Sequence, residues 1–298
     1  MNRTDIDADL VRGLLSAQFP EWAELPVSPV DSAGVDNAIF RLGADMCVRM
    51  PCSEWSAGHV RKEQRWLPGH ARRLPAKIPT PLGRGVPGAG FPWHWSVYQW
   101  LDGTDAITGH TADEHRTARD MAAFVRALQR IPTGDGPRAG LHSGLRGVPL
   151  PVREVAVRPS IDNLRGVIDT DRATAAWESA MRVPPWRGTP VWVHSDLHPG
   201  NILVRDGRVD AVIDWGLLNV GDPAVDLMVA WTYLTPAARE TFRAELAVDD
   251  DTWARGRGWA LCVGLIALAY YMRTNPVLGD LSRHAIDETL ADFELAAV

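Results

Sequence analysis

Short runs of alternating apolar and polar residues in the first hundred positions predict β-strands, because side chains on a strand point alternately to its two faces. The predicted strands cover residues 27–31, 38–42, 46–50, 82–86 and 95–100. Gly and Pro residues between these runs are typical of turns and links. The pattern therefore predicts a small antiparallel sheet.

Two segments of the same region have helical spacing instead. Thr4 can cap a first helix, in which Ile6 and Leu10 begin an apolar face. A second helix is predicted over 54–74, and Pro68 is expected to break it.

The remainder of the chain has a mainly helical pattern. Helices are predicted over 112–130, 161–181, 224–234, 236–246, 252–273 and 281–297. Residues 132–151, rich in Gly and Pro, are expected to form a long loop, and the boundary between the two regions is expected near 100–103. The longest apolar run, 259–272, is too short to cross a bilayer and predicts a buried helix.

Composition narrows the classes of protein that fit this pattern. Among 298 residues, 46% are hydrophobic and 23% charged, which are ordinary globular values. The net charge of −6 and the lack of a basic patch argue against nucleic-acid binding. The three cysteines form no C-x-x-C pair, and the N-terminus lacks an apolar signal core, so we expect a cytoplasmic protein with no membrane attachment.

Two motifs place oxygen-bearing side chains at the ends of short apolar strands. The first, HSDLHPGN, runs from His194 to Asn201, and the second, DWG, from Asp214 to Gly216. Four residues separate Asp196 from Asn201, as in the kinase loop H-R-D-x-x-x-x-N, and Asp214 stands where D-F-G is expected. Phosphoryl transfer needs a carboxylate near the attacking hydroxyl and oxygen ligands that hold Mg²⁺ against the nucleotide phosphates. The motifs therefore predict a phosphoryl-transfer site.

Each of these residues has a candidate role and a simpler alternative. Asp196 is the candidate for orienting or deprotonating the acceptor hydroxyl, a task for which a weak base suffices when the proton leaves late. Asn201 and Asp214 offer the hard oxygen ligands that Mg²⁺ prefers. The alternative for all three is a turn or helix-cap residue.

The segment from Val191 to Leu227, VWVHSDLHPGNILVRDGRVDAVIDWGLLNVGDPAVDL, resembles the aminoglycoside phosphotransferase family throughout. This resemblance implies an α+β, bilobal protein-kinase-like fold, with a nucleotide-binding N-lobe over 1–100 and a catalytic, mainly helical C-lobe over 101–298. It also implies a phosphotransferase that uses ATP or GTP with Mg²⁺. The acceptor is expected to be a small-molecule hydroxyl, on an aminoglycoside-type antibiotic by family resemblance, with a macrolide or a metabolite alcohol as alternatives.

The nucleotide side departs from the protein-kinase pattern at one position. In MCVRMP, Arg49 replaces the strand lysine that contacts the nucleotide phosphates, and its planar fork still suits phosphate. We expect Glu63, on the following helix, to pair with Arg49, although an exposed helix charge is the alternative. The segment from Asp31 to Gly43 falls where a phosphate-binding loop is expected. Three of its residues could supply hydrogen-bond donors to phosphate oxygens, or the segment could be a plain hairpin turn. These residues are Ser32, Gly34 and Asn37.

The resemblance also extends to supporting positions. SVYQWLDG resembles the hinge, where backbone groups near Gln99, Trp100 and Leu101 would bond the purine. Three further residues are expected to brace the catalytic loop, with Asp226 accepting backbone N–H groups. These residues are His194, His198 and Asp226.

Alternatives remain open for the activity and the acceptor. Arg49 and the sparse phosphate loop make a catalytically silent binding protein conceivable, whereas a protein kinase is disfavoured because no A-P-E segment follows Gly216. A polycationic acceptor could be met by acidic residues near the C-terminus, and an apolar acceptor by tryptophans. The acidic residues are Asp249, Asp250, Asp251, Asp280, Asp287, Glu288, Asp292 and Glu294. The tryptophans are Trp177, Trp186, Trp231, Trp253 and Trp259.

Overall fold

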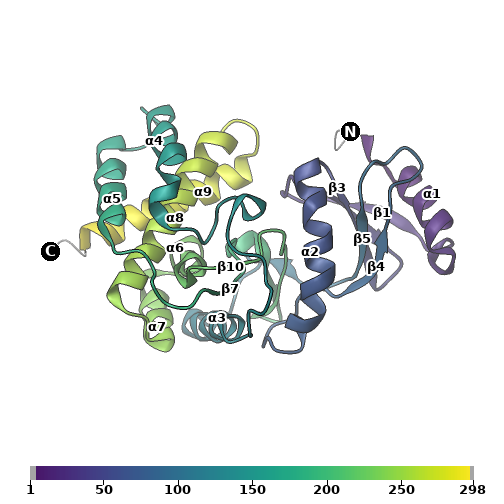
Figure 1. Ribbon diagram of the computed structural model, residues 1–298, viewed down its shortest axis with the longest axis horizontal. Helices are drawn as coiled ribbons and strands as arrows, with labels where there is room; N and C mark the ends of the chain where they lie inside the picture. Colours follow the sequence, from purple (N-terminus) through teal and green to yellow (C-terminus); the bar gives the residue numbers. More distant parts are fainter. Residues whose placement is uncertain (1–4, 296–298) are drawn as a thin grey trace. The chain divides into compact units, whose positions relative to one another are not determined.

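In the computed structural model, which describes residues 5–295, the alternating runs near the N-terminus form one five-stranded antiparallel sheet (Figure 1). The strands follow the order β1-β2-β3-β5-β4. Their bounds are β1 Val27–Val30, β2 Asn37–Leu42, β3 Met46–Pro51, β4 Pro81–Gly85 and β5 Trp95–Gln99. All five predicted strands are therefore confirmed, with ends that shift by one residue.

Two helices, α1 (Ala8–Gln18) and α2 (Glu54–Ala71), cover opposite faces of this sheet (Figure 1). Strand β3 shows the reason for this division. Its buried Val48 and Met50 join the hydrophobic core that includes α1, whereas Arg49 points to the other face and contacts α2. Alternation along one strand thus separates the packing face from a polar face.

Helix α1 begins at a carboxylate cap. The Asp7 side chain accepts the Leu10 N–H at 2.8 Å and satisfies one of the unpaired donors at the helix start. The cap predicted at Thr4 lies outside the described residues.

The prediction that Pro68 breaks the second helix is wrong, because α2 continues through Pro68 to Ala71. Proline removes one helical hydrogen bond, but the buried neighbours Leu67 and His70 hold the last turn in place. The His70 ring also bonds the Trp66 carbonyl at 2.7 Å. Tertiary burial therefore outweighs the local cost of the proline.

Contacts along the chain group it into two units. Unit 1 runs up to Gly103 and also includes Ala211–Gly216, whereas unit 2 consists of Thr104–Asp210 and the chain from Leu217 onward. The segment 211–216 thus groups with the sheet, although it follows about a hundred residues of unit 2 in sequence.

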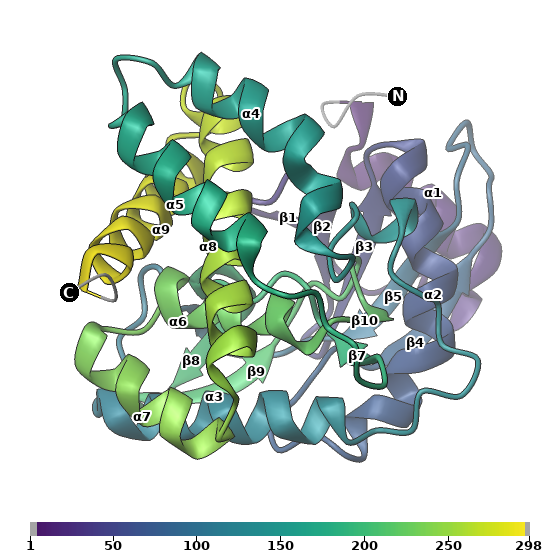
Figure 2. The same cartoon turned by 60° about the vertical axis from the view of Figure 1, so that its left-hand side comes forward.

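Unit 2 is mainly helical, with two small sheets. Its helices are α3 Glu114–Gln129, α4 Glu154–Asn163, α5 Thr170–Arg182, α6 Val229–Thr232, α7 Pro236–Leu246, α8 Asp250–Tyr271 and α9 Pro276–Leu295. Strands β7 (Val191–Val193) and β10 (Asn219–Gly221) pair, and β6 (Thr104–Asp105), β8 (Ile202–Arg205) and β9 (Arg208–Val212) form a second sheet, although the last two residues of β9 group with unit 1. Figure 2 shows α9 beside α8, with α3 and α7 running together below them.

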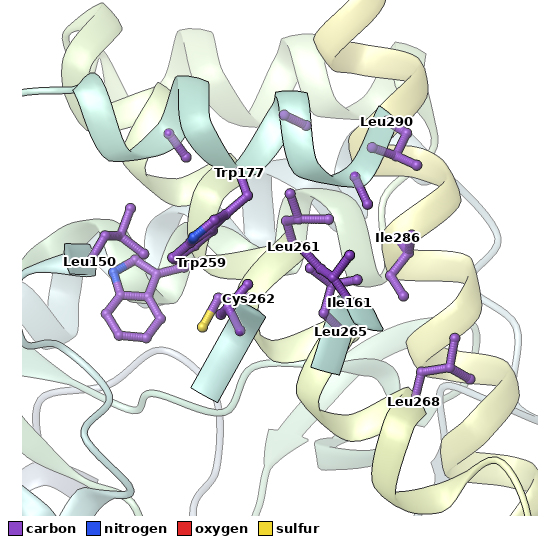
Figure 3. Packing of buried hydrophobic residues seen from close by; sticks show 14 of the residues in the cluster. Leu150, Ile161, Trp177, Trp259, Leu261, Cys262, Leu265, Leu268, Ile286 and Leu290 are labelled. Carbon is purple, nitrogen blue, oxygen red and sulfur yellow. The ribbon is translucent and has the colours of Figure 1, made fainter. Parts of the chain in front are cut away.

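The core of unit 2 surrounds α8. Trp177 and Trp259 are fully buried in a cluster that also includes Leu261, Leu265 and Ile286 (Figure 3). The apolar run at 259–272 forms the second half of α8, with Met272 as the residue that caps the helix, and packs into this cluster, so the predicted buried helix is confirmed. Within residues 5–295, no helix is long and apolar enough to cross a membrane.

Two helix predictions in unit 2 need correction. The single helix predicted over 161–181 is two helices, α4 and α5, because Gly166 adopts φ +78° between them and Asp169 caps the second. The helix predicted over 224–234 begins instead as a 3₁₀ helix, Pro223–Met228. The predicted loop at 132–151 is confirmed, and it contains short 3₁₀ turns and an isolated β-bridge between Arg138 and Val220.

Candidate active site

Arg49 is the centre of a polar cluster in unit 1. Its Nη1 donates to both oxygens of Glu63, at 2.9 and 3.2 Å, and its Nη2 donates to Asp214 Oδ1 at 3.0 Å. The Arg49 and Glu63 side chains are only 14% and 4% exposed, which confirms the predicted pair and excludes a surface charge for Glu63. The bond from Arg49 Nη2 to the Asp214 carboxylate was not predicted.

Burial and the charges of neighbouring side chains determine the protonation of Arg49 and Tyr98 in this cluster. Although burial alone lowers the pKa of Arg49, the carboxylates of Glu63 and Asp214 raise it above its ordinary value, so Arg49 is permanently charged. The Tyr98 hydroxyl donates to Glu63 Oε2. Burial and the Glu63 charge raise the pKa of Tyr98 well above its usual range, which keeps the phenol a hydrogen-bond donor.

Tyr98 was not among the predicted site residues, although strand pairing could have indicated it. Ser96 lies directly opposite Arg49 in the register of β3 and β5, and Tyr98 lies opposite Cys47. Residues two apart on a strand share a face, so Tyr98 lies on the same polar face as Arg49.

Asp214 reaches Arg49 from a strained turn after β9. Its backbone has φ +59°, a conformation that is uncommon for residues other than Gly, and its side chain is 39% exposed. The following Trp215 is fully buried and donates from Nε1 to the Val212 carbonyl at 3.0 Å. A Cβ on Gly216 would lie 2.7 Å from His59 Nδ1, so glycine is required where the turn meets α2.

In unit 2, the loop after β7 is held by a buried carboxylate. Asp226 accepts the N–H groups of His194 and Ser195 at 2.8 and 2.6 Å, the bracing contact that the resemblance implied. Ser195 has φ +74°, and Asn219 Nδ2 donates to its hydroxyl at 2.8 Å. Burial raises the pKa of Asp226 to about 7, against the lowering effect of the two N–H donors and with a raising effect of Asp196.

His194 and His198 both bond the backbone of this loop. His194 is fully buried, and its Nδ1 accepts the Asp196 N–H at 3.2 Å. His198 Nδ1 accepts the Gly200 N–H at 3.1 Å and so shapes the turn before Asn201. Both residues have the supporting geometry that was expected of them.

The Asp196 carboxylate is surrounded by donors from unit 2. Arg146 Nη1 lies 3.0 Å from Oδ1, Asn201 Nδ2 lies 3.4 Å from Oδ2, and His198 Nε2 lies 3.8 Å from Oδ2. Arg146 comes from the Gly- and Pro-rich loop and was not predicted as a site residue. Its position could not be found from sequence spacing, because 50 residues separate it from Asp196.

Asn201 is oriented by its amide nitrogen. Nδ2 bonds the Asp196 carbonyl at 3.0 Å and lies 3.1 Å from His198 Nε2. A cation would therefore be held by Asn201 Oδ1, which suits the preference of Mg²⁺ for oxygen ligands. The side chain is mostly buried, which fixes this orientation.

The predicted phosphate loop of unit 1 is stabilised by its own side chain. The Gly34 N–H donates to Ser32 Oγ at 3.1 Å, so in this structure that donor is already used. Asn37 lies at the start of β2, opposite Pro51 of β3. Binding of phosphate by this loop stays a prediction.

The predicted hinge also uses backbone donors within unit 1. The Gln99 N–H donates to the Thr80 carbonyl at 2.9 Å, and the Trp100 N–H donates to the Asp45 carbonyl at 2.7 Å. The Arg41 guanidinium stacks on the Trp100 ring at 4.1 Å. A purine would consequently meet other backbone groups of this segment, including those of Leu101, and this contact also stays a prediction.

Comparison with known proteins places this geometry in a family. A family model described as "Phosphotransferase enzyme family" matches residues 29–259. The uncharacterised protein YcbJ of Bacillus subtilis (strain 168) is 29% identical over 203 residues, 65% of this chain and 60% of YcbJ. An aminoglycoside 3′-phosphotransferase of Escherichia coli is 30% identical over 144 residues, 44% of this chain and 49% of that enzyme. The matches thus span about half to three-fifths of these relatives.

A solved structure shows the same fold over almost the whole chain. The GDP and kanamycin complex of APH(2″)-IIIa has a TM-score of 0.73 at 19% identity and covers 95% of this chain and 98% of its own. With the antiparallel sheet of unit 1 and the helices of unit 2, this likeness confirms the predicted α+β kinase-like fold. Since the family model covers most of the sequence, the chain belongs to the phosphotransferase enzyme family.

Proposed function

We propose that this protein transfers the γ-phosphoryl group of ATP or GTP to a hydroxyl of a small molecule, with Mg²⁺. The observation that carries the proposal is the buried cluster in which Arg49 holds Glu63 and Asp214. The permanently charged Arg49 guanidinium offers hydrogen-bond donors for phosphate oxygens, and the partly exposed Asp214 carboxylate beside it offers a metal ligand. A catalytically silent protein would have no chemical use for retaining this cluster along with Asp196 and Asn201.

The residues divide the reaction between them. Asp196 accepts a hydrogen bond from the acceptor hydroxyl and takes up its proton as the oxygen–phosphorus bond forms and the bond to the departing nucleoside diphosphate breaks. Asp214 and Asn201 would hold Mg²⁺, which supplies charge neutralisation at the phosphate oxygens when bound. Within residues 5–295 no three His, Cys, Asp or Glu side chains form a metal cage, and Mg²⁺ bound with phosphate needs only one or two protein ligands.

We propose an aminoglycoside-type acceptor, and the structure changes which carboxylates could meet it. Four of the acidic residues near the C-terminus pair with arginines of unit 2: Asp250, Glu288, Asp292 and Glu294. Asp249 caps α8 by accepting the Thr252 N–H. The exposed carboxylates that remain for a polycation are Asp251, Asp280 and Asp287.

A macrolide or a metabolite alcohol remains the alternative acceptor. Most of the tryptophans considered for an apolar acceptor are core residues: Trp177, Trp231, Trp253 and Trp259. Of that group only Trp186 is half-buried, and it packs on the Arg255 guanidinium. The tryptophans therefore favour the apolar acceptor less than their number in the sequence suggests.

The proposal is tested by following nucleoside diphosphate release from ATP and from GTP with aminoglycosides, macrolides and small alcohols in turn. Asp196→Ala should abolish acceptor-dependent transfer, by roughly a thousandfold or more, because it removes the group that orients the hydroxyl. Exposed Asp171→Ala, in the first turn of α5, is the matched control and should keep full turnover. Near-wild-type turnover in Asp196→Ala would contradict the proposed mechanism. Nucleotide binding without transfer to any acceptor would favour the silent binding protein.

We further propose a cytoplasmic location, where nucleoside triphosphates are abundant and thiols stay reduced. Cys47, Cys52 and Cys262 form no disulfide in the described residues, which agrees with a reducing compartment.

A further inference from the structure

Arg146 lies at the end of a tight turn whose backbone is unusually constrained. Three residues around it have left-handed backbone angles, with φ +59° at Gly144, +57° at Leu145 and +79° at Gly147. This conformation is costly for Leu145, which has a Cβ and a branched side chain. Strained backbone persists where the surroundings fix it, and it concentrates at functional sites.

Several hydrogen bonds fix this turn. The Leu145 N–H donates to the Gly140 carbonyl at 2.9 Å, and the Ser143 hydroxyl bonds the Arg146 carbonyl at 3.2 Å. The Asp222 N–H donates to the Gly147 carbonyl at 2.9 Å, which ties the turn to the chain leaving β10. The turn is therefore attached on both sides of Arg146.

The constrained turn directs Arg146 at the catalytic loop. Its Nη1 donates to the Ser195 carbonyl at 2.8 Å and to Asp196 Oδ1 at 3.0 Å, and it lies 3.9 Å from Met228 Sδ. Arg146 thus binds the carbonyl of Ser195, whose backbone has positive φ, and the carboxylate of Asp196. The Arg146 side chain is 17% exposed, so this ion pair is only weakly screened by water.

We propose that Arg146 is a positioning residue for phosphoryl transfer, which holds the Asp196 carboxylate in the orientation that receives the acceptor hydroxyl. The inference rests on the proposed function. Asn201 and His198 approach Oδ2, the other oxygen of Asp196, so Arg146 fixes one side of the carboxylate and leaves its remaining lone pairs for the acceptor. Misplacement of such a group by about 1 Å lowers turnover about 100-fold.

The test compares Arg146→Gln, Arg146→Lys and, as a matched control, Arg138→Gln in steady-state transfer from ATP to the best acceptor found for the wild type. Arg138 lies in the same loop, and its side chain is exposed and makes no contact with the catalytic loop in the structure of residues 5–295. Thermal unfolding of each variant establishes that it folds. The turnover number kcat and the KM for each of the two substrates are measured.

For Arg146→Gln we expect kcat to fall about 100-fold with both KM values within about threefold of the wild type, because orientation and not binding is lost. Arg146→Lys should recover part of kcat, since an ammonium can still reach Asp196, and Arg138→Gln should match the wild type. Where Arg146→Gln does not fold, Arg146→Lys decides by the same separation of kcat from KM.

A kcat for Arg146→Gln within twofold of the wild type would overturn the inference. A loss confined to the nucleotide KM would also overturn it, because Arg146 would then contact phosphate. An equal loss in Arg138→Gln would assign the effect to the loop as a whole. Failure of the proposed function looks different, because the wild type itself would then transfer phosphate to no acceptor.

Discussion

Arg49 makes a contact that lysine cannot reproduce. Its two terminal nitrogens hold Glu63 and Asp214 separately, whereas a lysine ammonium is a single point charge on a flexible stem. We expect Arg49→Lys to keep part of the activity, and Arg49→Ala to raise the nucleotide KM roughly tenfold or more and to slow transfer. Initial rates against ATP and GTP concentration measure both effects.

Arg84→Ala is the control for this pair, because Arg84 is an exposed residue on β4 of the same sheet. Wild-type kinetics in Arg49→Ala would remove the assigned role and strengthen the case for a silent binding protein.

Asp214 is expected to act on the nucleotide through the metal ion. Asp214→Asn should weaken nucleotide binding by roughly tenfold or more in the presence of Mg²⁺, and much less in its absence, because an amide is a poorer Mg²⁺ ligand than a carboxylate. Isothermal titration with Mg²⁺ and with a chelator separates the two conditions. Equal losses in both would indicate that Asp214 serves mainly to hold Arg49.

At the scale of elements, the stability of the link between the 3₁₀ helix Pro223–Met228 and the loop after β7 depends on the protonation of Asp226. Burial raises the pKa of Asp226 to about 7, above the value of about 4 for an unfolded aspartate. The folded protein therefore binds a proton that the unfolded chain has released between these values. The stability that this residue contributes is full below about pH 4, falls as pH rises toward 7, and is constant above that.

Asp226→Asn removes this titration. Between pH 4 and pH 7, we expect the unfolding free energy of the wild type to fall relative to that of the variant by on the order of a few kcal/mol. Chemical denaturation at several pH values measures it, with exposed Asp280→Asn as the control. A difference that does not change with pH would mean that Asp226 keeps the same protonation state in the folded and unfolded chain.

Elements with a clear period could be predicted from the sequence, and elements decided by distant contacts could not. The five strands of unit 1 and α7 lie where alternation and helical spacing indicate. Burial of Leu67 and His70 carries α2 past Pro68, and no local pattern reveals that burial. The break between α4 and α5 depends on one glycine, Gly166, which helices often tolerate.

The same division holds for the candidate site. Asp196, Asn201 and Asp214 belong to contiguous motifs, and the pair of Arg49 with Glu63 follows from strand and helix order. Arg146 has no motif of its own, and only the folded loop brings it to Asp196. Sequence spacing therefore does not identify Arg146.

At the scale of the whole molecule, Arg239 connects three helices of unit 2. This arginine of α7 is only 4% exposed, and it bonds the Ala230 carbonyl of α6 and the Glu288 carboxylate of α9 at 2.9 and 2.6 Å. Asp292 lies 3.5 Å away. Arg239→Met should lower the unfolding free energy by about 2 kcal/mol, a value reduced for the partial exposure of the two carboxylates.

Denaturant unfolding of Arg239→Met measures this loss, and exposed Arg119→Met on α3 serves as the comparison. The transfer rate of the folded variant should stay close to that of the wild type, since the bonds of Arg239 go to Ala230, Glu288 and Asp292 and to none of Arg49, Asp196, Asn201 and Asp214. A variant as stable as the wild type would show that the free-energy penalty for desolvating the Arg239 guanidinium equals the stabilisation from its hydrogen bonds and ion pairs.

The return of Ala211–Gly216 to unit 1 has a consequence for the order in which the protein is completed during synthesis. The ribosome releases the five strands of the sheet more than a hundred residues before this segment. Until then Lys77 lacks the Val212 N–H that donates to its carbonyl at 2.9 Å, and Arg49 has Glu63 but not Asp214. The cluster of Arg49, Glu63 and Asp214 is therefore completed late in translation, and no single cut of the chain can separate a whole unit 1 from unit 2.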